Sequence, residues 1–190
     1  LPLLQQIHNG RETLGDPLNR LREVALTSNG VLLTSERATA LRASGLDRIT
    51  VSLDAVDPEV AARMAGLRGG VPAGERLLQQ VFAGLQAATS AGFDPAAGGL
   101  KLNAVIQRTV NDDQLIPLAD LARRWGLELR LIEFMDVGNR NGWRPQLVLP
   151  AAEMVKRIGA RWPLQPRGRP VRGTARSWRY ADGGGCLGVI

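Results

Sequence analysis

The first chemical signal in the sequence is a lysine and an asparagine inside one apolar segment. Lys101 and Asn103 lie within the apolar run 100–106, which has the composition of a β-strand. Residues two apart on a strand point to the same face. A lysine in such a segment needs a partner or an anionic ligand, and beside an amide it suits a phosphate or a polar heterocycle. A lysine whose ammonium reaches water at the mouth of the strand is an equally good interpretation.

An arginine interrupts the apolar run 127–134 in the same way. Arg130 stands between two leucines, and a buried arginine usually binds a carboxylate or a phosphate. A structural ion pair with Glu128 or Glu133 is the alternative. Met135 closes the same run, and a place in the core is the default expectation for a single methionine.

Hydroxyl residues end the two earlier strand candidates. Thr27 belongs to Thr27-Ser28-Asn29-Gly30, which by itself reads as a turn. Ser52 belongs to Ser52-Leu53-Asp54, which leads to the helix start at Asp57-Pro58 and so also fits helix capping. In a parallel α/β sheet, however, ligands bind at the carboxyl ends of the strands, so both positions are candidates for a site.

The single histidine and the single cysteine give weaker signals. His8 lies in a polar stretch and is interpreted as a surface residue. Cys186 follows three glycines and is interpreted as a packed thiol rather than a ligand. One cysteine excludes an internal disulfide and a metal site built from local cysteines, which fits a reducing cytoplasm.

The elements that must position these residues alternate between strand and helix. We expect strands near 24–27, 48–53, 100–106 and 127–134, separated by helical patterns at 35–43, from 57 onward, at 73–91 and at 113–125. Ser35 is the expected N-cap of the first helix, and Gly126 is expected to end the last in a left-handed conformation. This order predicts a parallel sheet with right-handed crossovers. The strands should be adjacent, and Thr27, Ser52, Lys101, Arg130 and Met135 should converge.

The pattern changes after Pro145. One more helix is expected from 151 to about 158, and the Pro-, Gly- and Arg-rich stretch 163–174 reads as a linker. A hairpin is expected around 181–185. The basic residues after Glu153 indicate either a solvated linker or a surface for phosphates, and composition favours the solvated linker.

Composition bounds the class of protein. The chain has 190 residues with 44% apolar and 4% aromatic residues, so it is globular, with a core built from aliphatic side chains. The formal net charge is +6. No apolar run approaches the roughly 20 residues that span a bilayer, and the first residues lack the features of a signal peptide. Because the first residue is not Met, we expect a fragment, a processed chain or part of a longer one.

Taken together, the segments match a known family in order along the chain. The sequence resembles the GTP 3′,8-cyclases of molybdenum cofactor biosynthesis, a radical S-adenosylmethionine (SAM) family. The motifs that carry the resemblance are Leu26-Thr27-Ser28-Asn29-Gly30, Ala43 to Asp54, Lys101-Leu102-Asn103-Ala104-Val105, Val110-Asn111-Asp112-Asp113, Arg130-Leu131-Ile132-Glu133-Phe134-Met135, and Tyr180 to Ile190 as Tyr-x-x-x-Gly-Gly-x-x-Gly-x-Ile. Thr109 stands where the family often has glycine.

The resemblance implies an α/β fold, part of an incomplete (β/α)6 TIM-type barrel. Residues 1–145 would hold strands three to six of the barrel, and residues 146–190 a helix, a basic linker and the start of a C-terminal substrate-binding region. Carried over residue by residue, it implies GTP contacts at Thr27, Lys101 and Arg130 and SAM contacts at Ser52 and Met135. Asn103 is a further candidate from its position.

The resemblance also implies cofactors, chemistry and partners. The family uses SAM and two 4Fe–4S clusters to convert GTP to (8S)-3′,8-cyclo-7,8-dihydroguanosine 5′-triphosphate, by hydrogen abstraction from the ribose C3′. Both sets of cluster cysteines are missing from these 190 residues, so the chain is expected to be inactive alone and no metal ligand is assigned. A homodimer and a downstream cyclic pyranopterin monophosphate synthase are the implied partners. The alternatives are a non-catalytic nucleotide-binding remnant or another radical SAM enzyme, such as a peptide-modifying one.

Overall fold

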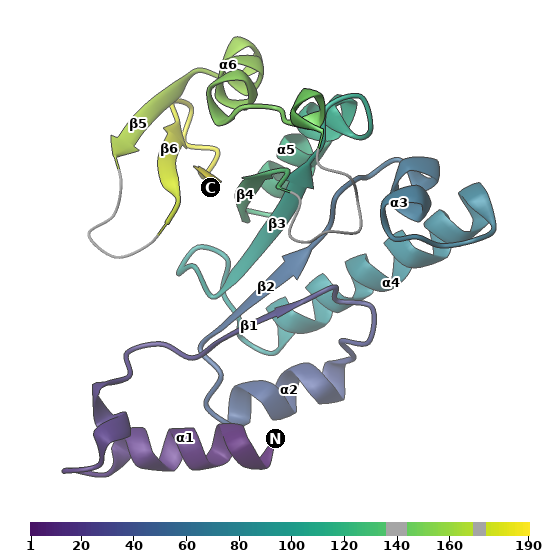
Figure 1. Cartoon of the computed structure of the whole chain (residues 1–190). Helices are drawn as coiled ribbons and strands as arrows, with labels where there is room; N and C mark the ends of the chain where they lie inside the picture. Colours follow the sequence, from purple (N-terminus) through teal and green to yellow (C-terminus); the bar gives the residue numbers. More distant parts are fainter. Residues whose placement is uncertain (136–143, 169–173) are drawn as a thin grey trace. The chain divides into compact units, whose positions relative to one another are not determined.

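A computed structural model describes residues 1–135, 144–168 and 174–190 of the chain. Helices and strands alternate as far as β4, and three strands with one further helix complete the described chain (Figure 1). The chain divides into two compact units, Leu1–Ser52 with Gln79–Lys101 and Leu53–Leu78 with Leu102–Ile190.

The first unit contains two parallel strands and their helices. Its elements are α1 (Pro2–Glu12), a 3-10 turn η1 (Pro17–Arg20), β1 (Ala25–Ser28), α2 (Ser35–Ala43), β2 (Arg48–Ser52) and the part of α4 (Gly70–Ser90) from Gln79 onward. β1 and β2 pair in parallel, with Thr27 opposite Thr50. The core of this unit is aliphatic apart from Phe93 and includes Ala38, Leu46, Ile49, Val51, Val81, Leu85, Ala88 and Leu100.

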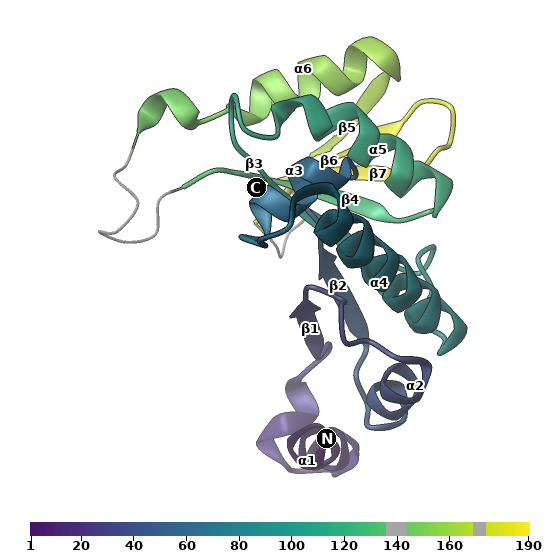
Figure 2. The ribbon, with the colours of Figure 1, turned by 90° about the vertical axis from the view of Figure 1, so that its right-hand side faces the viewer.

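The second unit contains most of the remaining sheet. Its elements are α3 (Pro58–Met64), β3 (Leu100–Ile106) from Leu102 onward, η2 (Asp112–Gln114), α5 (Leu115–Arg124), β4 (Glu128–Glu133), η3 (Pro145–Leu147), α6 (Ala151–Arg161), β5 (Leu164–Gly168), β6 (Arg176–Tyr180) and β7 (Cys186–Val189). The strand order is β3-β4-β7-β6-β5. α5 and α6 lie side by side and both contact β4 (Figure 2).

The side chains of β3 alternate between two faces of the sheet, and one of these faces is part of the hydrophobic core. Leu102, Ala104 and Ile106 are almost fully buried, whereas Asn103 and Val105 between them are half-buried. The same alternation holds in β4, where Leu129 and Leu131 are fully buried. Both strands therefore bury one aliphatic face and leave the polar residues on the other.

Local signals set most helix ends as expected, with one correction. Asp57 caps α3 by accepting a hydrogen bond from the Val60 amide at 3.0 Å, and Pro58 is the first helical residue. Gly126 follows α5 with φ of +68°. The predicted N-cap of α2 was wrong, because Thr34 is the cap, accepting from the Arg37 amide, and Ser35 begins the helix.

The C-terminal segment holds two further findings. The expected hairpin is present, since β6 and β7 pair antiparallel. The expected linker at 163–174 was wrong in its first part, where Leu164–Gly168 form β5 and pair antiparallel with β6, while residues 169–173 lie outside the described chain. β7 also pairs in parallel with β4, which no local pattern indicated. None of the described helices has both the length and the apolar character needed to cross a membrane.

Candidate functional site

Two predicted site residues share a face of the first unit. Thr27 lies opposite Thr50 in the parallel register, and Ser52 follows two residues further along β2. Register partners and residues two apart point to the same side, so all three hydroxyls lie on one face. At the amino end of that face, Arg48 donates to Thr50 Oγ1 at 2.9 Å and forms a two-pronged ion pair with Glu23. Thr27 and Ser52 therefore lie toward the carboxyl end, where α/β sheets bind ligands.

Lys101 is the second residue of β3 and lies near the strand's amino end. Its side chain is half-buried, and a Cβ added at Gly98 would lie 3.8 Å from its Nζ. Lys101 also takes part in an interaction within the chain. The ammonium thus extends along the loop that precedes the strand, which matches the interpretation of a lysine at the strand mouth.

Arg130 has a carboxylate partner on its own strand. Its Nε donates to Glu128 Oε1 at 2.8 Å, and both side chains are about three-quarters covered. Of the two ion pairs considered from the sequence, the structure contains the one with Glu128. Glu133 instead accepts a hydrogen bond from the Ala151 amide at the start of α6. Arg130 also lies across Gly188 of β7, where an added Cβ would lie 3.3 Å from Arg130 Cγ.

Met135 is not a core residue. It is the second residue after β4 and is 67% exposed, so the default expectation of a core methionine was wrong. An exposed, polarisable thioether at the end of a strand is free to contact a ligand or a neighbouring segment.

Two buried amides that were not assigned a role hold the loop after β2. Asn111 is fully buried, and its Nδ2 donates to the carbonyl oxygens of Asp54 at 2.8 Å and Val105 at 2.9 Å, while its Oδ1 accepts from the Gln107 amide at 2.7 Å. Gln114 is also buried, and its Oε1 accepts hydrogen bonds from the backbone amides of Val56 and of Asp57, the N-cap of α3. The motif containing Asn111 was recognised in the sequence, but an asparagine after a strand reads as a turn and gives no sign of long-range bonds.

Asp54 makes the last hydrogen bond between β3 and the residues that directly follow β2. The Leu53 amide donates to the Asn103 carbonyl at 2.9 Å, and one residue on, the Val105 amide donates to Asp54 Oδ1 at 2.8 Å. Burial raises the pKa of the Asp54 carboxyl above its usual range, and the Val105 hydrogen bond opposes this only partly. A half-buried carboxylate at this position is a hydrogen-bond acceptor and a general-base candidate that the sequence had suggested only as a possible cap.

Most of the basic residues near α6 that the structure describes have partners. Arg108 forms a two-pronged pair with Glu153, the shorter contact being 2.6 Å, and Arg157 contacts both Glu153 and Asp112. The two arginines hold the pKa of Glu153 below its usual range. This network connects the segment after β3 to α6. Because these arginines pair with carboxylates of the chain, the network favours a structural role over a surface for phosphates.

Arg123 performs a similar role at the hairpin. Its guanidinium lies 4.8 Å from the ring centre of Trp162 and 4.3 Å from that of Tyr180, and it pairs with Asp182 at 2.6 Å. Burial raises the pKa of Tyr180 to about 12. A Cβ added at Gly184 would lie 2.3 Å from Arg123 Nη1, so a side chain at this glycine of the Gly-Gly motif would have to displace the guanidinium.

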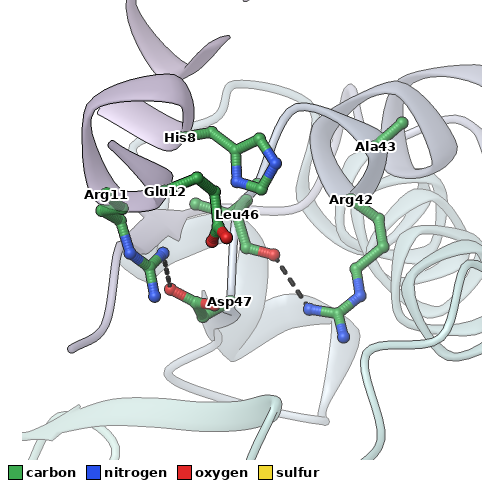
Figure 3. Close-up of a pocket in the computed structure, with 8 residues that line it drawn as sticks. His8, Arg11, Glu12, Arg42, Ala43, Leu46 and Asp47 are labelled. Carbon is green, nitrogen blue, oxygen red and sulfur yellow. Dashed lines mark hydrogen bonds and ion pairs between the residues drawn. The ribbon is translucent and has the colours of Figure 1, made fainter. Parts of the chain in front are cut away.

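A polar pocket of about 410 Å³ lies at the other end of β2 (Figure 3). Arg11 pairs with Asp47 at 2.7 Å, and Arg42 donates to the Leu46 carbonyl at 3.0 Å. His8, predicted to be a surface residue, is half-buried and packs against Gly45, where an added Cβ would lie 2.6 Å from its side chain. The arginines that line this pocket are therefore held by one carboxylate and one backbone carbonyl of the lining. Within the described ranges, no group of three or more His, Cys, Asp or Glu side chains is arranged to hold a metal ion.

Comparison with known families gives the class of the protein. Residues 4–122 match the profile of the Radical SAM superfamily, and residues 127–190 match that of Molybdenum Cofactor Synthesis C. The chain therefore belongs to the radical SAM superfamily, and its α/β architecture with parallel strand pairs fits a partial TIM-type barrel.

Individual relatives point further. The chain is 65% identical over all 190 residues to the GTP 3′,8-cyclase of Synechococcus sp. (strain CC9605), covering 55% of that protein, and 66% identical over the same length to that of strain WH7803. It is 47% identical over 171 residues to the GTP 3′,8-cyclase of Xanthomonas campestris pv. campestris (strain B100), covering 90% of this chain and 47% of the relative. The chain spans about half the length of these curated relatives.

Proposed function

We propose that this chain is the central part of a GTP 3′,8-cyclase of molybdenum cofactor biosynthesis. The observation that carries the proposal is the 65% identity to a protein of that name without a break in coverage of the 190 residues. The match of residues 127–190 to Molybdenum Cofactor Synthesis C supports it independently from the C-terminal third of the chain. The proposed reaction converts GTP to (8S)-3′,8-cyclo-7,8-dihydroguanosine 5′-triphosphate, with SAM as the source of the hydrogen-abstracting radical.

The proposal assigns roles to six residues. Thr27, Lys101 and Arg130 would contact GTP, Ser52 and Met135 would contact SAM, and Asn103 is a further binding candidate. In support, Thr27 and Ser52 share a face of adjacent parallel strands. Arg130 keeps guanidinium donors beyond the one paired with Glu128, and arginine is well suited to phosphate oxygens.

The iron–sulfur clusters of the family do not fit the residues of this chain. A cluster requires three or four thiolates, and the sequence has Cys186 alone, whose thiol accepts a hydrogen bond from Arg167 at 3.3 Å. The proposal therefore assigns both 4Fe–4S clusters to cysteines outside these 190 residues and derives no step through them. Residues 1–190 alone should not cleave SAM.

Three further assignments belong to the proposal. Residues 1–145 would form the barrel part and residues 146–190 the start of the substrate-binding region. The partners would be a second copy of the protein and a downstream cyclic pyranopterin monophosphate synthase. The compartment would be the cytoplasm, which fits a chain with a single free cysteine.

A chimera tests the proposal. Residues 1–190 replace the matching segment of the Synechococcus sp. (strain CC9605) cyclase, so that the relative supplies the rest of its length. After anaerobic reconstitution with iron and sulfide, the chimera receives reductant, SAM and GTP. We expect 5′-deoxyadenosine and cyclised GTP at rates comparable to the parent enzyme.

Two controls separate the alternatives. A Lys101→Met chimera should keep its cluster absorbance and lose GTP turnover. A chimera that assembles, carries its clusters and cleaves SAM without cyclising GTP would indicate another radical SAM activity. One that binds GTP and cleaves no SAM would indicate a nucleotide-binding remnant.

A further inference from the structure

Asn103 differs from the buried amides Asn111 and Gln114 of the second unit. Its Oδ1 is buried and has no hydrogen-bond partner in the described structure. By contrast, Asn111 uses both its amide oxygen and its amide nitrogen for backbone groups, and the Oε1 of Gln114 accepts from two backbone amides. A buried polar atom without a partner disfavours the folded state, and asparagine is also a poor strand residue. Packing alone therefore gives no reason for an asparagine at this position.

The backbone around Asn103 is firmly held. Its carbonyl accepts from the Leu53 amide at 2.9 Å, and its neighbours Leu102 and Ala104 are almost fully buried on the opposite face. The side chain lies on the half-buried face of β3. Rotation about the Cβ–Cγ bond exchanges the amide oxygen and the NH2 group between the covered and the open side, so that either can meet a ligand.

Asp54, the residue that follows the backbone partner of Asn103, indicates which kind of ligand group fits. Asp54 Oδ1 accepts a hydrogen bond from the Val105 amide at 2.8 Å. In the same pair of segments, the Leu53 amide donates to the Asn103 carbonyl. A carboxylate repels phosphate oxygens and accepts hydrogen bonds from hydroxyl and amino groups. A neutral amide offers both a donor and an acceptor to the same kind of group. The pair therefore matches a nucleoside, whose ribose hydroxyls and base edge are neutral and rich in donors.

We propose that Asn103 recognises the nucleoside part of the nucleotide ligand, rather than its phosphates. This inference rests on the proposed function, in which two ligands carry a nucleoside, GTP and SAM. On this inference the unpartnered amide of Asn103 determines ligand specificity, and the stability that it costs the folded chain is offset by its role in recognition.

The test uses calorimetric titration of the 190-residue chain with four probes: GTP, guanosine, SAM and inorganic tripolyphosphate. Asn103→Leu keeps the size of the side chain and removes its polar atoms. We expect it to weaken binding of guanosine and GTP, or of SAM, by about tenfold, the worth of a typical neutral hydrogen bond. Tripolyphosphate binding should stay within about twofold. Which nucleoside loses affinity identifies the ligand that Asn103 contacts.

Two companion variants complete the design. Lys101→Met should weaken tripolyphosphate and GTP together and leave guanosine unchanged. The exposed Asn19→Leu is the matched asparagine control and should change nothing. The melting temperature of Asn103→Leu should equal or exceed that of the wild type, because the substitution removes an unpartnered group.

The outcomes distinguish this inference from the proposed function. Equal nucleoside binding by wild type and Asn103→Leu overturns the inference and leaves the function standing. The inference is also overturned if Asn103→Leu loses affinity for nucleosides and tripolyphosphate alike and melts at a lower temperature, because Asn103 would then have a structural role. If neither the wild-type chain nor the chimera binds GTP or SAM, the proposed function fails, and the inference fails with it.

Discussion

Removal of the Asn111 side chain should destabilise the chain more than any exposed substitution. Asn111→Ala removes the side-chain partner of three partly buried backbone groups: the carbonyls of Asp54 and Val105 and the amide of Gln107. At about 1–1.5 kcal/mol for each, the expected loss is roughly 3–5 kcal/mol. That is a large share of the roughly 5–15 kcal/mol that stabilises a typical domain. For a chain of this length this loss lowers the melting temperature by roughly 6–20 °C.

Urea unfolding followed by circular dichroism and tryptophan fluorescence measures the loss. Asn19→Ala, at an exposed asparagine, is the control and should stay within about 0.5 kcal/mol of the wild type. A loss below about 1 kcal/mol for Asn111→Ala would show that the amide does not hold the segment after β2.

Asn111→Asp tests the same reasoning through pH. The new carboxylate keeps the Gln107 contact but faces two carbonyl oxygens in a buried position, which raises its folded-state pKa. A raised pKa favours the folded state only while the group is protonated, so the variant should regain stability as the pH falls through that value. Destabilisation that does not depend on pH would contradict the assigned contacts.

Three other substitutions follow from the described contacts. Because burial raises the pKa of Asp54, Asp54→Asn should be more stable than the wild type at pH 7, and the gain should vanish below the usual value of 3.8, as thermal melts at a series of pH values would show. Thr109 has φ of +62°, so Thr109→Gly should raise the free energy of unfolding by roughly 0.5–1 kcal/mol in urea titrations; a decrease would refute the strain. Gly184→Ala should displace Arg123 from its aromatic and carboxylate contacts and cost about 1–2 kcal/mol, but almost nothing in an Arg123→Ala background.

The sequence predicted those features that depend on neighbouring residues. The alternation of strands and helices, the Asp57-Pro58 helix start, Gly126 after α5 and the β6–β7 hairpin are all encoded within a few residues. The parallel pairing of β7 with β4 joins residues nearly 60 positions apart, and no local pattern carries that information. β5 was missed because proline and glycine usually interrupt strands, whereas here they lie in a strand paired on one side to β6.

The candidate site divides in the same way. Polar residues on apolar strands marked Thr27, Ser52, Asn103 and Arg130 from sequence alone, because alternation fixes which face they occupy. Their partners could not be read in advance. The choice of Glu128 for Arg130 and the absence of a partner for Asn103 Oδ1 depend on side-chain geometry after folding.

The transfer of a hydrogen atom from GTP to the SAM-derived 5′-deoxyadenosyl radical, which becomes 5′-deoxyadenosine, tests the central claim most directly. The chimera that carries residues 1–190 is supplied with SAM and GTP deuterated at the ribose C3′, and the 5′-deoxyadenosine is analysed by mass spectrometry. The proposed function predicts one deuterium in the 5′-deoxyadenosine, formed together with cyclised GTP. Unlabelled 5′-deoxyadenosine from a chimera that carries its clusters would show that these 190 residues do not position GTP for this reaction.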